Sequence, residues 1–560
     1  MFIPTSKDEL NRIGWKQMDV ILITGDTYVD SPFIGVAVIG KVLLDAGYKV
    51  GIIAQPDITG DTDICRLGEP SIFWGITSGC MDSMISNYTS LNKRRRRDDL
   101  TGGGLNIRRP DLAVIAYTNL IRRYFKKTRP IVIGGMEASL RRISHYHYAT
   151  DSIRRSILFD AKADILVYGM GERTILELAE RIRQHRSFTD VRGICYASAE
   201  KKEGYIELPS HADVVAFPEI FSNMFKVFYQ NNDPITAKGM CQKQDSRYLI
   251  HNPPQISLST EELDHIHELG YERDVHPYYA SWGSVRALET IRFSLITHRG
   301  CYGECRFCAI SVHEGKTVTD RSEASILKEA SILTEHPKFK GIIQDVGGPT
   351  ANMFNIECER KKKRGACRNK RCLTPVVCEK LAVSHGPQIA LLKKLKELPK
   401  VKKVFIGSGI RHDLVLHDQT YGLKYLEEII GHHISGQLKL APEHSENHIL
   451  KLMGKPAIEG FIEFKRRFDN INRRLNKKQF LTCYFIAAFP GCTMQDMERL
   501  NRFSHDVLKF RPRQVQIFTP SPSTPATLMY FTEKSYDNGK PLFVEKHNSK
   551  RENQKNLILK

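Results

Sequence analysis

Runs of apolar residues alternate with amphipathic stretches through the first 200 residues. The runs Val20–Thr24 and Val50–Ala54 have the length of strands, and helical spacing of apolar residues fills 33–46 between them. Further strands are expected at 72–77, 112–116, 131–133 and 165–168. This alternation predicts an N-terminal α/β domain, residues 1–200, built on a doubly wound parallel sheet whose loops at the strand carboxyl ends carry ligands.

The periodic pattern weakens over residues 201–285, which are expected to be a connector, and then returns. Six apolar runs predict strands, each followed by a helical stretch, at 290–297, 341–346, 403–406, 437–440, 480–486 and 514–518. Six such repeats predict a partial (β/α)6 barrel over residues 286–535, with its active face at the strand carboxyl ends. Residues 536–560 are polar and lysine-rich, and are expected to be a frayed tail.

Composition limits the class of protein. With 560 residues, 41% hydrophobic and 26% charged, the chain is long enough for about three or four folding units and is not disordered throughout. No apolar run approaches the roughly 18 residues of a membrane span, and the first 15 residues lack the apolar core of a signal peptide. A cytoplasmic protein without a membrane partner is therefore expected.

The chain is basic, because 83 lysines and arginines against 63 acidic residues give a net charge of 83 − 63 = +20. Five consecutive basic residues at 93–97 lie in a segment, 90–110, with almost no apolar residues, which predicts a long surface loop. Contact with nucleic acid and a simple solvated charge run are both consistent with this loop.

Cys301, Cys305 and Cys308 form a CxxxCxxC run directly after the first expected barrel strand. Three thiolates on one loop can converge on a metal centre, and their softness selects zinc, copper(I) or an iron–sulfur cluster. A closed zinc site needs a fourth ligand, such as His298 or His313. Three ligands on a four-iron cube would instead leave one iron open for a substrate, and the position at a strand carboxyl end favours this catalytic alternative.

With Phe307 just before its last cysteine, the run resembles the signature of the radical S-adenosylmethionine (radical SAM) superfamily. Four other stretches resemble the YgiQ-like radical SAM proteins: GDTYVD at 25–30, GMEASLRR at 135–142, YGMGER at 168–173 and APEH at 441–444. The resemblance thus covers almost the whole chain.

The resemblance implies a [4Fe–4S] cluster on the three cysteines, with S-adenosylmethionine bound at the open iron. One electron from an external flavodoxin- or ferredoxin-like donor would cleave this cofactor to methionine and a 5′-deoxyadenosyl radical. This reduction requires the low end of the range of cluster potentials, which spans roughly −700 to +450 mV. Gly347 and Gly348 correspond to a glycine-rich turn whose backbone meets the methionine amino group. Pro349 stands where an acidic residue usually follows.

Three further placements follow from strand order within the resemblance. Ser408 would reach the ribose, Glu443 a polar end of the cofactor, and the turn at 489–491 the adenine. A helix-capping serine, a surface glutamate and an ordinary turn are the alternative interpretations.

A second cysteine group lies in a basic insert at 355–380 and comprises Cys358, Cys367, Cys372 and Cys378. Zinc or an auxiliary cluster would organise this insert, which has little apolar content of its own. Reduced, functionally silent cysteines are the alternative, because the spacings match no standard zinc knuckle.

The N-terminal sheet resembles cobalamin-binding folds. Pro32 stands where their DxHxxG pattern has its histidine, so histidine-ligated cobalamin is not expected, whereas cobalamin held without a protein ligand stays open. Arginines and histidines at 141–155 would bind a phosphate, stabilise a radical substrate, or form an exposed helix face.

Taken together, the sequence predicts a radical SAM enzyme whose substrate it does not specify, and it offers no general acid or base. Two alternatives remain: a basic nucleic-acid-binding protein with structural zinc, and a radical SAM enzyme that acts on RNA.

Overall fold

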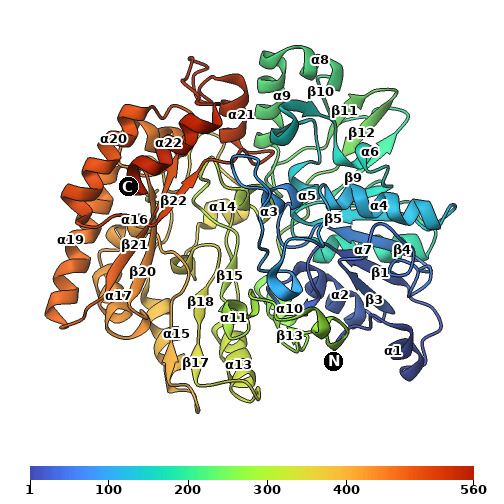
Figure 1. Cartoon of the computed structure of the whole chain (residues 1–560), viewed down its shortest axis with the longest axis horizontal. Coiled ribbons are helices and arrows are strands. Elements are labelled where there is room, and N and C mark those ends of the chain that lie inside the picture. Colours follow the sequence, from blue (N-terminus) through green and yellow to red (C-terminus); the bar gives the residue numbers. More distant parts are fainter. Residues whose placement is uncertain (560) are drawn as a thin grey trace. The chain divides into compact units, whose positions relative to one another are not determined.

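The structure, a computed structural model, describes residues 1–559, which form two compact units (Figure 1). The first unit comprises Met1–Leu258 and His265–Arg292, and the second comprises Ser259–Asp264 and the chain from Phe293 onward. The backbone therefore passes from one unit to the other three times.

A nine-stranded sheet forms the centre of the first unit. Five of its strands are parallel, in the order β3-β1-β4-β5-β8, and they are β1 (Val20–Thr24), β3 (Val50–Ala54), β4 (Phe73–Thr77), β5 (Ile131–Gly134) and β8 (Ile165–Val167). By chain order this is the 2-1-3-4-5 arrangement of doubly wound folds, whose ligand crevice lies where the first and third strands meet. The predicted bounds of β1 and β3 are confirmed.

Four more strands extend the sheet beyond β8. They are β9 (Ile194–Ser198), β12 (Arg247–His251), β11 (Met240–Gln244) and β10 (Ile206–Leu208), and β9 and β12 run antiparallel to their neighbours. The sequence indicated a connector from residue 201, but these pairings place three of the strands in the N-terminal sheet. β10 and β11 contain several polar residues, so their sequences lack the apolar alternation that would predict strands.

Helices cover both faces of the sheet. The connections from β1 to β3 and from β4 to β5 run in opposite directions, so right-handed crossovers place α2 (Gly35–Asp45) and α4 (Ala113–Tyr124) on opposite faces.

The prediction of a strand at 112–116 is wrong, because these residues begin α4. Ala113, Val114, Tyr117 and Ile121 are buried at helical spacing. Other helices of this unit are α5 (Gly135–Leu140), α7 (Glu172–Arg183) and α9 (Pro218–Gln230).

The second unit contains strand segments in all six predicted places. They are β14 (Ser294–Ile296), β17 (Ile342–Ile343) with β18 (Asp345–Gly347), β19 (Lys403–Val404), β20 (Gln437–Glu443), β21 (Phe480–Ala487) and β22 (Gln514–Ile517). Each pairs in parallel with a neighbour in chain order: β14 with β18, β17 with β19, and β20 with β21 and then β22. A parallel bridge from Ile410 to Leu440 connects the chain after β19 to β20.

Helices follow these strands, and all but the last of them, α21, lie in predicted helical stretches. They are α13 (Glu323–Thr334), α15 (Gly386–Glu397), α17 (Gly422–Glu428), α19 (Ile458–Arg474), α20 (Met494–Phe503) and α21 (Pro525–Thr532). No helix among residues 1–559 combines the length and apolar character needed to cross a membrane.

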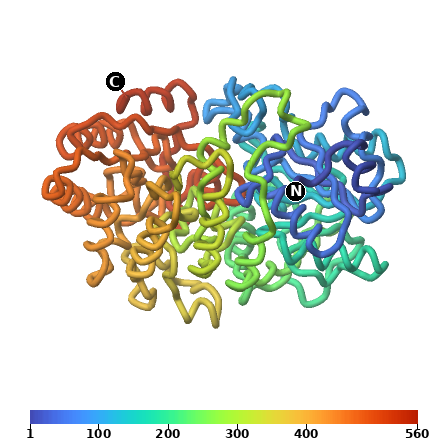
Figure 2. The backbone as a smooth tube through the Cα atoms, turned by 90° about the horizontal axis from the view of Figure 1, so that it is seen from below, coloured from blue at the N-terminus to red at the C-terminus, as the bar shows by residue number. Residues whose placement is uncertain are grey.

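The chain end is not a frayed tail. Residues Asn548–Leu559 form α22, which packs on α20 and β22, and Figure 2 shows this red helix over orange and red segments of the same unit. Arg551, Gln554 and Ile558 are buried, and Arg551 donates a 2.6 Å hydrogen bond to the Phe518 carbonyl. The helix buries polar side chains, which is why its sequence looked solvent-exposed.

Candidate metal centre

The CxxxCxxC loop is closed at its base by two short strands. β15 (His298–Arg299) pairs antiparallel with β16 (Thr319–Asp320), so the loop begins and ends at one place after β14. Gly300 has a φ of +80°, and a β-carbon there would lie 2.1 Å from the Thr317 carbonyl oxygen. Only glycine fits this turn, which starts the loop next to Cys301.

Two of the cysteine sulfur atoms lie next to Gly303. A β-carbon added at Gly303 would lie 3.3 Å from Cys301 Sγ and 3.6 Å from Cys305 Sγ. The Gly303 amide donates to Cys301 Sγ at 3.3 Å, and the Cys308 amide donates to the Cys305 carbonyl at 3.0 Å, which turns the chain so that the third thiol follows the second. The loop thus places the Cys301 and Cys305 thiols beside Gly303, and Cys308 three residues further along the same loop.

Charge on one thiol is felt by the others. Burial raises the pKa of Cys301, and a thiolate at Cys305 raises it further. Burial likewise raises the pKa of Cys308, and Cys305 and then Cys301 add to this effect. Burial and mutual repulsion thus disfavour the thiolate forms of Cys301 and Cys308, and a bound cation would favour them.

Arg411, which the sequence analysis did not select, lies beside these thiols. Its Nη1 is 3.8 Å from Cys305 Sγ and would be 3.0 Å from a β-carbon at Gly303. Asp413 pairs with the same guanidinium. Both residues follow the Gly407-Ser408-Gly409 turn after β19 and are separated by one residue. Their place after a strand was the sequence feature that could have marked them as site residues.

Gly347 is the last residue of the neighbouring strand β18, and Gly348 follows it. The Gly347 carbonyl accepts a 2.8 Å hydrogen bond from the Thr297 amide. A β-carbon at Gly348 would lie 2.7 Å from both Nε2 and the carbonyl oxygen of His298, so no side chain fits there. Burial lowers the pKa of His298 to about 4, which keeps this imidazole neutral. Thr350 Oγ1, further along, is 3.7 Å from Cys301 Sγ.

The Ser408 hydroxyl is engaged within the chain. It donates to Asp345, whose Oδ1 also accepts from the amides of Gly407 at 2.8 Å and Ser408 at 3.0 Å. This carboxylate fixes the turn after β19 and so the approach to Arg411.

Glu443 is buried and strained, not a surface glutamate. It ends β20 with a φ of +71°, a region that non-glycine residues rarely occupy, and its side chain is 9% exposed. Burial raises its pKa to about 7, although Lys455, with Nζ 3.9 Å away, and Arg411 act to lower it. A strained, protonatable carboxyl at a strand carboxyl end is typical of a functional site.

The turn at 489–491 meets the cysteine loop through aromatic rings. Phe489 is buried and packs edge-to-face with Phe307 at a centroid distance of 6.3 Å. Its other side packs on Phe518 at 5.2 Å. The turn thus supports the residue between the second and third cysteines.

The insert cysteines pack next to the loop. Cys358, Cys372 and Cys378 belong to one apolar cluster with Tyr302 and Cys301. Lys361 Nζ is 3.5 Å from Cys372 Sγ, while Arg360 donates to Cys367 Sγ. Burial raises the pKa of Cys372 to about 11. All 13 cysteines are free thiols.

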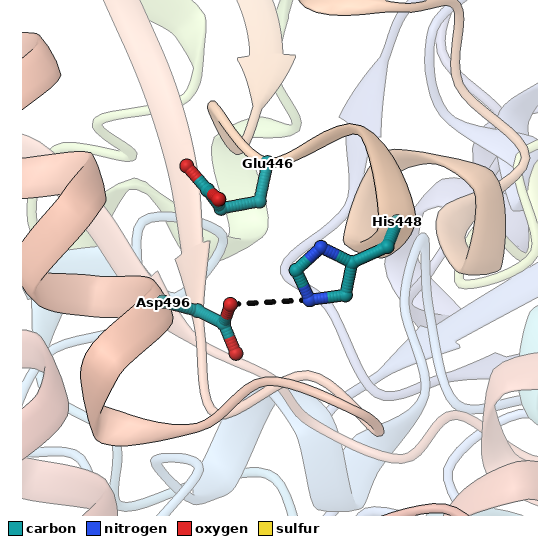
Figure 3. Close-up of side chains that lie close together, drawn as sticks. All are labelled: Glu446, His448 and Asp496. Atoms are coloured by element: carbon teal, nitrogen blue, oxygen red, sulfur yellow. Dashed lines mark ion pairs between the residues drawn. The ribbon is translucent and has the colours of Figure 1, made fainter.

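Among residues 1–559, one group alone brings three ligand atoms within 4.8 Å of one another: Glu446, His448 and Asp496 (Figure 3). Asp496 accepts from His448 Nε2 at 3.1 Å. Arg499 forms ion pairs with both carboxylates, and its Nε is 2.6 Å from Glu446 Oε2. The guanidinium therefore already neutralises part of their negative charge. No cysteine belongs to this group, so neither cysteine set has the close ligand spacing of a single zinc ion in the described chain.

The basic cluster at 141–155 is not an exposed helix face. Arg141, Arg142, His145 and His147 are buried, the histidines within strand β6 (His145–His147). The Arg142 guanidinium lies 4.5 Å from the Tyr168 ring centroid and 4.6 Å from that of Phe228. Most of this cluster therefore belongs to the core of the first unit.

Comparison with known proteins identifies the family. A family model described as "Radical SAM N-terminal" matches residues 2–294. UPF0313 protein FN0734 of Fusobacterium nucleatum is 54% identical over 558 residues, covering 100% of this chain and 98% of its own. The chain belongs to the UPF0313 family, the YgiQ-like radical SAM proteins. A UPF0313 protein of Thermotoga petrophila is 45% identical over 562 residues, with coverage of 100% and 98%. This UPF0313 member is therefore a radical SAM enzyme.

Two solved structures are similar to this UPF0313 fold. TsrM of Kitasatospora setae, a radical S-adenosylmethionine methyltransferase with cobalamin and a [4Fe–4S] cluster bound, is 13% identical with a TM-score of 0.51, covering 96% of this chain and 85% of TsrM. OxsB, a cobalamin-dependent S-adenosylmethionine radical enzyme, is 14% identical with a TM-score of 0.50, covering 94% and 57%. At these identities the likeness concerns the fold.

Proposed function

We propose that Cys301, Cys305 and Cys308 hold a [4Fe–4S] cluster and that the chain uses it to cleave S-adenosylmethionine. When bound, such a cluster supplies the electron that yields methionine and a 5′-deoxyadenosyl radical. The observation that carries the proposal is that the three cysteines share one loop after β14, with the Cys301 and Cys305 sulfurs beside Gly303, in a chain of the radical SAM class. The substrate of the radical is not assigned.

The donor set suits a cluster better than a single ion. The three sulfurs are soft donors on one loop, yet they are not within 4.8 Å of one another in the described chain. A cluster spreads its thiolates over several iron atoms and so accepts wider spacing. The structural-zinc alternative would need a tighter, four-ligand arrangement.

The surrounding residues would bind and orient the cofactor. The six strand segments of the second unit form the partial barrel in this proposal, with the cysteine loop at its carboxyl edge. A β-carbon at Gly347 would lie 3.0 Å from Ala351 Cα, and one at Gly348 would lie 2.7 Å from His298, so in this proposal the methionine group meets backbone and no side chain at these glycines. Because Asp345 occupies the Ser408 hydroxyl, Glu443 is the better candidate for a polar contact with the cofactor.

The decisive experiment is anaerobic incubation with dithionite and S-adenosylmethionine, followed by measurement of 5′-deoxyadenosine. Product should form with wild type and be lost with C301A, C305A and C308A, each of which should also lower the iron content. C65A, a thiol of the first unit, is the matched control and should keep both. Product in all three variants would refute the proposal.

We infer that the first unit does not hold cobalamin. Arg109 is fully buried at the carboxyl end of β1, where it pairs with Asp26 and, at 2.9 Å, with Asp98. A β-carbon at Gly25 would lie 2.2 Å from the Ser78 carbonyl oxygen, so the strand ends are also in contact. We therefore expect that anaerobic gel filtration with hydroxocobalamin recovers protein free of corrinoid absorbance.

An external flavodoxin- or ferredoxin-like electron donor completes the proposal, because reduction of such a cluster needs a strong reductant. RNA is retained as a possible substrate class, supported by the net charge of +20 and the exposed residues 93–97. Binding of RNA that weakens steeply with salt would support that class, and salt-independent or absent binding would remove it.

A further inference from the structure

The guanidinium of Arg411 is held in one orientation. Asp413 accepts from Nε at 2.9 and 3.2 Å and also from Nη2, which occupies that side of the planar group. Nη1 is on the other side, 3.8 Å from Cys305 Sγ. The carboxylate therefore directs the remaining nitrogen toward the cysteine loop.

The backbone at Arg411 is fixed independently. Its amide donates to Asn352 Oδ1 at 2.7 Å, and Asn352 Nδ2 donates back to the Arg411 carbonyl at 3.0 Å. Asn352 is fully buried. Two separate sets of contacts thus fix the distance between the guanidinium and the sulfur atoms.

The charge at this position is permanent. Burial acts to lower the pKa of Arg411, but the Asp413 carboxylate outweighs burial and raises it, so the group stays protonated. In turn, Arg411 outweighs burial at Asp413 and lowers its pKa to about 2. Of these two groups, it is the Arg411 charge that acts on Cys301.

We propose that Arg411 sets the reduction potential of a cluster bound to Cys301, Cys305 and Cys308. This inference rests on the proposed function. Reduction adds one electron from the external donor and makes the cluster more negative, so a fixed N–H donor and positive charge at Cys305 stabilise the reduced form. Arg411 is a positioning residue, since it acts through a ligand sulfur, and Asp413 moderates its charge.

The test is a redox titration of anaerobically purified protein with dithionite, followed by electron paramagnetic resonance, after iron and sulfide have been measured. At the wild-type midpoint potential, R411Q should show a reduced-to-oxidised ratio about tenfold lower than wild type, which is about 59 mV for one electron. R411K should fall between them, because it keeps the charge but loses the planar fork.

D413N changes the same pair in the opposite sense. Removing the carboxylate leaves the guanidinium charge less compensated, so the midpoint should rise, and this variant decides the question if R411Q binds no iron. R499Q, which removes an α20 arginine paired with Asp496 and Glu446, is the control and should keep the wild-type midpoint.

The outcomes separate the two proposals. Wild-type protein without iron and sulfide would overturn the proposed function. Wild-type iron content with an unchanged midpoint in R411Q, or a D413N midpoint that does not rise, would overturn the role of Arg411 and leave the cluster in place.

Discussion

The buried carboxyl of Glu443 should make the second unit less stable as pH rises. Its pKa of about 7 in the folded chain compares with 4.5 ordinarily, so the folded state holds a proton that the unfolded state releases. The contribution of this proton is complete below pH 4.5 and is lost as pH rises through 7. At 1.36 kcal/mol for each tenfold change in proton affinity, the whole effect is about 3 kcal/mol, and about 2.5 kcal/mol lies between pH 5 and pH 8.

E443Q keeps the shape of the side chain but cannot ionise. Relative to wild type, this variant should therefore gain about 2.5 kcal/mol of stability between pH 5 and pH 8. E498Q, at an exposed position of α20, should change little over the same range.

Hydrogen exchange of the β20 backbone, corrected for intrinsic rates, is the suitable measurement. Tryptophan fluorescence would not report on this unit, because Trp15, Trp74 and Trp282 all belong to the first one. Wild-type and E443Q protection factors that run parallel from pH 5 to pH 8 would refute the argument. They would mean that Glu443 is solvated or remains fully paired with Lys455.

Three other outcomes are expected. R109M, which leaves Asp26 and Asp98 buried without their partner, should cost roughly 3–5 kcal/mol in urea unfolding followed by tryptophan fluorescence; a loss below 1 kcal/mol would contradict this pairing. G303A should lower the iron content, because its methyl group would lie 3.0 Å from Arg411 Nη1 and close to two sulfurs; iron equal to wild type would contradict the described loop. Removal of residues 547–560 should expose α20 and β22 and speed proteolysis of this unit, whereas unchanged digestion would show that α22 is dispensable.

Continuous apolar runs were the part of the fold that the sequence predicted best. β1 and β3 are buried along their whole length, so their apolar character marked both ends correctly. The segment at 112–116 has the same composition, but it begins α4, whose buried residues continue at helical spacing to Ile121. A five-residue apolar window cannot distinguish these cases.

The part of the site that could be predicted is the part whose residues are close together in the sequence. Cys301, Cys305 and Cys308 share one loop, so their sequence spacing already limits their separation. Arg411 comes from a segment about 100 residues later, and only the pairing of strands brings it to Cys305. The buried state of Glu443 likewise depends on packing that no local pattern reveals.

The short excursion Ser259–Asp264 limits how the molecule can be divided. Asp264 accepts from the Ser322 amide at 3.0 Å and lies 3.9 Å from the Arg321 guanidinium, both in the second unit. A cut after Arg292 would leave this hexapeptide on the wrong fragment and deprive Arg321 of that neighbour. Anyone wishing to express the cysteine-bearing half alone would need to start upstream of Ser259 or graft the six residues back.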